Sequence, residues 1–298
     1  MIPAAEQGRL LRLATRAALG VALMLTLGKA LAWWASGSVS LLAGLTDSLL
    51  DSAASLINLL AVHYALRPAD DDHRYGHGKA EALAGLGQAL FIAISSLLVG
   101  FQAVDRLLAP QPLEAQPLGI AVILLSLAAT IGLLLLQRRV IRLTGSTAIR
   151  ADSLHYRSDL LLNLGILAAL LLSAWGWQRA DGLFGLGIAF YILFSAVRIA
   201  REALSVLMDS ELPVEQSQRM HELACAVPGV LGAHDLRTRV SGRHWFVQLH
   251  LELPGSLSLN EAHHICVKVE EAIREEFPRA EVLVHADPED VVHPSHSK

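Results

Sequence analysis

Residues 118–136 read LGIAVILLSLAATIGLLLL and contain no charged side chain. An α-helix rises about 1.5 Å per residue, so a run of this length crosses the ~30 Å hydrocarbon core of a bilayer. The chain has 298 residues, of which 53% are hydrophobic, and its mean hydropathy is +0.44. This composition is more apolar than that of an ordinary soluble domain, so the sequence predicts an integral membrane protein.

Six segments in all are long enough to span a bilayer. They are Leu10–Trp34, Val39–Leu66, Lys79–Leu108, Leu118–Arg138, Thr147–Trp175 and Leu183–Leu207. The first is longer than the apolar part of a signal peptide and lacks a clear small-residue cleavage site, so we expect a spanning helix there. Hydropathy alone would start the fifth helix near Leu160, and only a start near Thr147 takes His155 and Asp159 to mid-membrane depth.

Basic residues gather in the loops on one side of the predicted bundle. They are Arg9, Arg12, Arg16, Arg67, Arg74, Lys79, Arg138, Arg139, Arg142 and Arg150. The opposite loops carry only Arg106 and Arg179 near their ends. Positive charge is retained on the cytoplasmic side, so both termini are predicted to be cytoplasmic.

The composition becomes more polar after Asp209, where a second domain begins. The expected elements are a helix over Val214–Val227, strands over Gly232–Val240 and Trp245–Leu253, a helix over Ser258–Phe277 and a strand over Glu281–Ala286. The order α-β-β-α-β indicates a small α+β, ferredoxin-like domain. We therefore expect a six-helix transmembrane domain over 1–208, a cytoplasmic domain over 209–290, and a disordered polar tail over 291–298.

Charge and cysteine usage exclude other classes of protein. The net charge is −4 and no basic block stands out, so nucleic acid is not an expected partner. Two cysteines, Cys225 and Cys266, rule out a disulfide framework or a thiolate zinc finger. Both are expected to be small buried residues in a reducing compartment.

Ionisable residues inside two of the predicted spans are the main functional signal. Asp47 and Asp51 lie four apart on the second helix, and His155 and Asp159 lie four apart on the fifth, so each pair shares a helix face. A carboxylate at the bilayer centre costs about 2.5–3.5 kcal/mol. Four oxygen and nitrogen ligands without a thiolate favour zinc or a similar divalent ion over Cu(I). The alternative is a set of polar side chains that serve helix packing.

Two further groups of histidines and carboxylates lie outside the spans. Residues 70–79 read DDDHRYGHGK, a pattern that can wrap around a cation, although a solvated acidic loop is the alternative. In the C-terminal domain the candidates are His234, His250, His263, His264, His285 and Asp287. Each histidine alone is more often a surface residue. The remaining histidines are assigned no role; they are His63, His221, His244, His293 and His296.

These features together resemble the cation diffusion facilitators. The resemblance is carried by the two pairs on the second and fifth helices and by several stretches similar to bacterial members of the family. Those stretches are Pro68-Ala69-Asp70, the run Tyr75–Glu81, the run Ala151–His155 and the run Ser258–His263. The resemblance extends from about Leu10 to Pro288.

The resemblance implies three metal sites and a homodimer. The implied membrane transport site is Asp47, Asp51, His155 and Asp159; the loop site is Asp70, His73 and His77; the cytoplasmic binuclear site is His234, His250, His263, His285 and Asp287. A charge interlock of the dimer falls on Lys79 and Asp209. His264, Asp71 and Asp72 are extra residues next to expected ligands.

The expected function is efflux of a divalent transition metal across the bacterial inner membrane. Zinc is the first candidate, with Fe²⁺ and Cd²⁺ as further ones, and protons are the expected counter-ion in an alternating-access antiport. Zinc would also have a structural or regulatory role in the cytoplasmic domain, and membrane lipid surrounds the spans. A membrane metalloenzyme is disfavoured, because His-Glu-x-x-His is missing and four protein ligands leave no open position. A metal-gated sensor that transports nothing stays open as the alternative.

Overall fold

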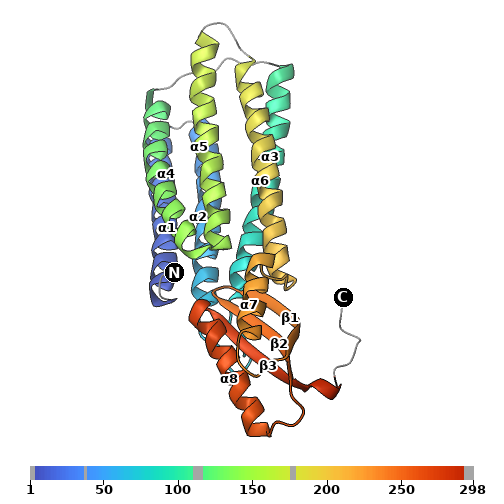
Figure 1. Cartoon of the computed structure of the whole chain (residues 1–298). Coiled ribbons are helices and arrows are strands. Elements are labelled where there is room, and N and C mark those ends of the chain that lie inside the picture. Colours follow the sequence, from blue (N-terminus) through green and yellow to red (C-terminus); the bar gives the residue numbers. More distant parts are fainter. Residues whose placement is uncertain (1–3, 37–38, 110–116, 175–178, 292–298) are drawn as a thin grey trace. The chain divides into compact units, whose positions relative to one another are not determined.

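The computed structural model describes residues 4–36, 39–109, 117–174 and 179–291 (Figure 1). Six long helices come first: α1 (Ala4–Ser36), α2 (Val39–Ala65), α3 (Lys79–Leu108), α4 (Pro117–Thr144), α5 (Thr147–Ala174) and α6 (Ala180–Leu207). They are followed by α7 (Val214–Cys225), β1 (Gly232–Ser241), β2 (His244–Leu253), α8 (Leu259–Glu276), β3 (Ala280–Pro288) and the short 3-10 helix η1 (Glu289–Val291). The expected bundle of six helices followed by an α-β-β-α-β domain is confirmed.

The chain divides into two compact units. One contains Met1–Pro68 and Ala80–Leu204, and the other contains Ala69–Lys79 and Ser205–Lys298. The loop between α2 and α3 therefore groups with the C-terminal unit. Of the tail expected over 291–298, residues 292–298 lie outside the described residues.

Within the described ranges, four helices are long and apolar enough to cross a membrane. The qualifying segments are Glu6–Trp34 of α1, Lys79–Leu108 of α3, Ile123–Thr144 of α4 and Gly182–Leu207 of α6. The other two long helices, α2 and α5, are the ones that carry the ionisable pairs.

The junction between α4 and α5 decides how deep the fifth helix places its ligands. The fourth helix continues to Thr144 instead of ending near Arg138 as predicted, because arginines on its last turns resemble a loop in hydropathy while still forming a helix. Gly145 adopts a φ of 70° and donates its N–H to the carbonyl of Ile141 at 2.8 Å, an αL cap. Ser146 then accepts a hydrogen bond from the N–H of Ile149 at 3.2 Å, so α5 begins at Thr147 as required.

Helix α5 lies at the centre of the first unit. On one side Ile149 packs with Leu11 of α1, Val62 of α2 and Val140 of α4. On another side Leu154 packs with residues of α3 and α6, which are Ala89, Ile92, Ile192, Ala196 and Ile199. Every residue from 151 to 156 is buried. A histidine or carboxylate in this stretch is thus shielded from solvent by the bundle itself.

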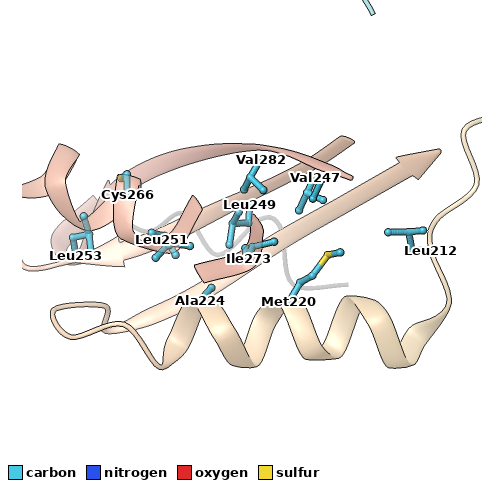
Figure 2. Close-up of a cluster of buried hydrophobic side chains, with 12 residues drawn as sticks. Leu212, Met220, Ala224, Val247, Leu249, Leu251, Leu253, Cys266, Ile273 and Val282 are labelled. Carbon is cyan, nitrogen blue, oxygen red and sulfur yellow. The ribbon is translucent and has the colours of Figure 1, made fainter. Parts of the chain in front are cut away.

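The C-terminal unit is a three-stranded sheet covered on one face by two helices. The strand order is β1-β2-β3, with β1 and β2 antiparallel and β2 and β3 parallel. Figure 2 shows side chains of β2 facing Met220 and Ala224 of α7 and Ile273 of α8 across the core. The inward side chains are Val247, Leu249, Leu251 and Leu253, so His250 between them projects from the opposite face. A capping box of Ser258 and Glu261 starts α8.

The two cysteines differ in exposure. Cys266 is buried, as expected, but Cys225 is exposed, which corrects the sequence-based expectation. The buried residues of α7 are Met220 and Ala224. Cys225 follows Ala224 by one position and is therefore rotated about 100° away from the core.

Candidate metal centres

The first candidate centre joins α2 and α5. His155 Nε2 lies 3.0 Å from Asp51 Oδ1 and 3.7 Å from Asp159 Oδ2, and one ligand atom of each residue lies within 4.8 Å of the others. The His155 side chain is only 8% exposed. Asp47 precedes Asp51 by one helical turn on α2, but its side chain lies outside the described residues. Two carboxylates and an imidazole that converge in this way can hold a divalent cation.

Tyr156 fixes the orientation of α5 next to this centre. Its hydroxyl donates to the carbonyl of Ala18 on α1 at 2.9 Å and lies 3.0 Å from the hydroxyl of Ser55 on α2. Buried polar groups need such partners. Because Tyr156 adjoins His155, its two contacts hold the imidazole facing α2.

Asp152 forms a second buried polar centre one turn before His155. Its side chain accepts hydrogen bonds from Gln137 Nε2 of α4 at 2.7 Å and from Gln88 Nε2 of α3 at 3.3 Å, and the residue is fully buried. The bonds tie three helices together at the depth of the candidate metal centre. This role of Asp152 was not expected from the sequence, although a carboxylate three residues before a candidate histidine ligand was the available signal.

The second candidate centre is the loop between α2 and α3. His73 Nδ1 lies 3.3 Å from Asp70 Oδ1, and His77 Nε2 lies 3.2 Å from Asp70 Oδ2. The backbone N–H of His73 also donates to Asp70 Oδ1 at 2.7 Å, and this bond lowers the pKa of Asp70 below its ordinary value. Of the two extra aspartates, Asp71 pairs with Arg74 at 3.0 Å, and Asp72 is exposed.

This loop is fastened to the β1–β2 hairpin within the same unit. A side chain at Gly78 would collide with the backbone carbonyl of Ser241, so the two backbones can approach only because residue 78 is glycine. The guanidinium of Arg239 stacks over the rings of Tyr75 and Phe246 at 4.5 and 5.0 Å. The loop ligands therefore belong to a rigid surface of the C-terminal unit.

The residues predicted to form a charge interlock are in contact within one chain. Lys79 Nζ lies 2.9 Å from Asp209 Oδ1, and Arg239 lies 3.6 Å from the same oxygen. Asp209 adopts a positive φ of 56° directly after α6. Both residues belong to the C-terminal unit, so the ion pair is internal to that unit.

The third candidate centre spans all three strands of the sheet. The register pairs His234 with His250 and His250 with His285, so the three imidazoles form a row. Asp287 follows on β3, with Oδ2 at 2.8 Å from His250 Nδ1 and 3.5 Å from His234 Nε2, and Oδ1 at 3.1 Å from His285 Nε2. Among the described residues, the compact group of possible ligands is His234, His250 and Asp287, and it includes neither His285 nor His263, which is exposed on α8.

Two carboxylates near this row were not expected from the sequence. Glu252 Oε1 lies 3.2 Å from His234 Nδ1, and Asp235 Oδ2 lies 3.9 Å from His250 Nε2. A side chain at Gly232 would meet the Glu252 carboxylate at 2.8 Å, so this glycine leaves room for the glutamate. The spacing of two between His250 and Glu252 on one strand face was the signal that could have identified Glu252.

Comparisons with known proteins identify the family of the chain. Residues 15–208 match the cation efflux transmembrane domain, and residues 212–289 match the cytoplasmic domain of cation efflux proteins. The cation-efflux pumps FieF of Klebsiella pneumoniae, Citrobacter koseri and Salmonella arizonae are each 50% identical over 285 residues, which cover 96% of this chain and 95% of each relative.

Two solved structures are also similar to this chain. CzrB in its zinc form has 31% identity and covers 29% of this chain and 99% of its own, with a TM-score of 0.27. A variant of the MamM C-terminal domain has 31% identity and covers 25% of this chain and 94% of its own, with a TM-score of 0.24. From the family matches and the FieF relatives, the chain belongs to the cation efflux family, the cation diffusion facilitators, and is a multi-pass membrane transporter of divalent metal cations, not an enzyme.

Proposed function

We propose that this transporter exports zinc from the bacterial cytoplasm across the inner membrane in exchange for protons. The observation that carries the proposal is the convergence of Asp51 and Asp159 on the buried imidazole of His155 between α2 and α5. Asp47, one turn before Asp51, is proposed as the fourth ligand. Fe²⁺ and Cd²⁺ are proposed as competing substrates.

The chemistry of the ligands supports zinc as the cargo. Zinc binds imidazole nitrogen and carboxylate oxygen at about 2.0–2.2 Å in tetrahedral sites. One imidazole among carboxylates is softer than the all-oxygen shell that suits Mg²⁺ or Mn²⁺, and a site without thiolate does not favour Cu(I). Zinc and its close neighbours are therefore the divalent ions that fit this set best.

The same ligands support exchange against protons. A metal ion binds only deprotonated groups, so proton and metal compete for the same lone pairs. When His155 Nε2 carries a proton, the N–H faces Asp51 Oδ1 at 3.0 Å. A metal ion that takes this nitrogen must displace that proton. Imidazole is also the side chain that titrates nearest neutral pH, so the exchange can run in the physiological range.

The proposal also covers the direction of zinc transport and the assembly of the transporter as a homodimer. The basic loops support cytoplasmic termini, so the loop and sheet clusters would face the metal pool that the cell must empty. Transport would proceed by alternating access in a homodimer, with Lys79 and Asp209 as its charge interlock. The loop and sheet clusters are proposed to sense metal and to stabilise the dimer, because they lie outside the membrane bundle.

Reconstitution in proteoliposomes tests the proposal. With membrane voltage clamped and equal zinc on both sides, an imposed pH gradient should drive zinc toward the acidic side. Zinc flux that ignores the gradient would leave a uniporter as the better account. No flux under any gradient, in protein that still binds zinc, would favour the metal-gated sensor.

A further inference from the structure

A histidine and a cysteine meet on α7, apart from the three clusters described above. Cys225 Sγ lies 3.8 Å from Nδ1 and 3.9 Å from Nε2 of His221, and both residues are exposed. Residues four apart lie one helical turn apart, so both side chains project from the same face. Two zinc ligands on one helix use the same spacing in the His-Glu-x-x-His motif. An ion from solvent can therefore reach both donors at once.

A backbone contact orients the imidazole. His221 Nε2 lies 2.9 Å from the carbonyl oxygen of Ala233 on β1. A carbonyl only accepts, so Nε2 carries the hydrogen and Nδ1 keeps its lone pair. Metal-binding histidines almost always donate their second ring N–H to such an acceptor. The ring is thus held in the tautomer that a metal ion requires at Nδ1, and the contact can persist when an ion binds.

The separation of the two donors suits a single ion. A tetrahedral ion bonded at about 2.3 Å to sulfur and about 2.0–2.1 Å to nitrogen places the two donor atoms about 3.6 Å apart. The observed separation of Sγ from Nδ1 is 3.8 Å. Because Sγ lies almost equally far from both ring nitrogens, Cys225 must change rotamer to bring Sγ beside an ion at the Nδ1 lone pair, and its exposed position leaves room for that change. Water can fill the remaining coordination positions.

We propose that His221 and Cys225 form a binding site for a soft, thiophilic metal cation, of which Cd²⁺ is the best probe. A thiolate donor selects soft ions, whereas the three clusters offer only oxygen and nitrogen. Binding forms a metal–sulfur bond while the thiol releases its proton to water, and no oxidant or reductant takes part. The site does not depend on the transport mechanism.

The other cysteine provides an internal control. Cys266 is buried in the core of the C-terminal unit, and burial raises the pKa of its thiol. It therefore stays protonated and inaccessible under conditions in which Cys225 can bind. The contact of His221 with Ala233, which directly precedes His234, also links the new site to the strand that begins the sheet cluster.

Titration of the reduced, full-length protein in detergent with Cd²⁺ tests the site. A cadmium–thiolate bond gives a charge-transfer absorption in the ultraviolet that oxygen and nitrogen ligands do not give. The band should appear in the wild type, persist in Cys266→Ala and disappear in Cys225→Ser. His221→Ala should weaken the Cd²⁺ affinity reported by the band by ~10-fold or more, whereas His264→Ala, at an exposed position of α8, should leave it unchanged.

Several results would overturn the inference. They are a wild type without the band, a band that survives in Cys225→Ser, and an unchanged affinity in His221→Ala, which would mean that the thiol binds alone. Alkylation mapped by mass spectrometry provides a measurement that needs no variant. Cd²⁺ should protect Cys225 of the wild-type protein from alkylation, and an unprotected Cys225 at saturating Cd²⁺ would contradict the site.

Discussion

The centre between α2 and α5 and the row of imidazoles on the sheet use the same kinds of side chain in opposite surroundings. In the helix bundle the His155 side chain is 8% exposed, whereas on the sheet the side chains of His234, His250 and His285 are 29%, 34% and 65% exposed. A buried charged shell is costly when it is empty, which is why we propose that protons replace the metal there. An exposed shell equilibrates with solvent at little cost. The difference is consistent with the proposed proton exchange in the bundle and the proposed metal sensing on the sheet.

The largest effect is expected from a ligand in the bundle. Asp159→Asn should lower zinc transport by more than ~100-fold, since loss of a direct ligand should exceed the ~10–100-fold that loss of a group behind a ligand costs. Asp105→Asn, at an exposed carboxylate of α3, is the matched control and should transport normally. Proteoliposome flux is the measurement, and a wild-type rate in Asp159→Asn would remove this residue from the site.

A change of ligand type in the centre between α2 and α5 tests which metal ions this centre prefers. His155→Asp replaces the nitrogen donor with oxygen, so the shell becomes harder and should admit Mn²⁺ alongside zinc. Competition between the two ions for transport measures the change. An unchanged preference would count against His155 as a ligand, because a residue outside the shell does not alter its donor set.

Residue spacing predicted which ionisable residues share a helix face, but not which helices these residues contact. The four-residue intervals indicated that Asp51 and Asp159 each share a helix face with a second ionisable residue. Spacing within one helix does not reveal which helices face each other, so the contact of His155 with Asp51 was visible only in the folded chain. The bonds of Asp152 to glutamines on α3 and α4 are of this non-local kind.

The sheet was more predictable than the bundle because its signal is local. The alternation of apolar and polar residues along β2 is enough to place His250 opposite the core. The lateral register that brings His234 and His285 beside it depends on pairing between strands, which alternation alone does not determine. Cys225 was misjudged because a general preference of cysteine for burial outweighed its position one residue past the buried face of α7.

Asp152 tests whether the bundle must be held rigidly around its ligands. Asp152→Leu leaves the N–H groups of Gln88 and Gln137 unpaired, at about 1–3 kcal/mol each, and should lower the unfolding temperature in detergent and reduce transport. Asp152→Asn keeps one oxygen, which can accept from only one of the two glutamines, and should recover part of the stability. A leucine variant as stable as the wild type would show that the centre does not hold the three helices together.

On the sheet, loss of a ligand should change the response to zinc while transport persists. Asp287 contacts three imidazoles, so Asp287→Ala should remove most of the zinc-induced stabilisation of the C-terminal unit. That stabilisation is about 2.7 kcal/mol at a free zinc concentration 100 times the dissociation constant. Thermal unfolding of the full chain with and without zinc measures it, and Asp290→Ala is the control. An equal zinc response in both variants would place the ligand elsewhere.

The smallest effect is expected from an ion pair between α7 and α8, the two helices that cover the sheet. Its removal should change the stability of the C-terminal unit without changing the unit's response to zinc. Arg219 of α7 donates to both carboxylate oxygens of Glu276 on α8, each at 2.9 Å, and this pairing lowers the pKa of Glu276. A carboxyl group with a lowered folded-state pKa stabilises the fold above its unfolded-state pKa, and the contribution is lost as pH falls through the folded-state value. The unfolding temperature of the unit should therefore decrease on acidification below about pH 4.5 more in the wild type than in Glu276→Gln. Because the pair is exposed, the difference should be at most about 4 °C.

Zinc added at neutral pH should raise the unfolding temperature equally in both proteins, since the pair does not touch the imidazole row. A smaller zinc response in Glu276→Gln would mean that the helices and the metal row are coupled, and the sheet would then be a sensor whose scaffold is part of its signal.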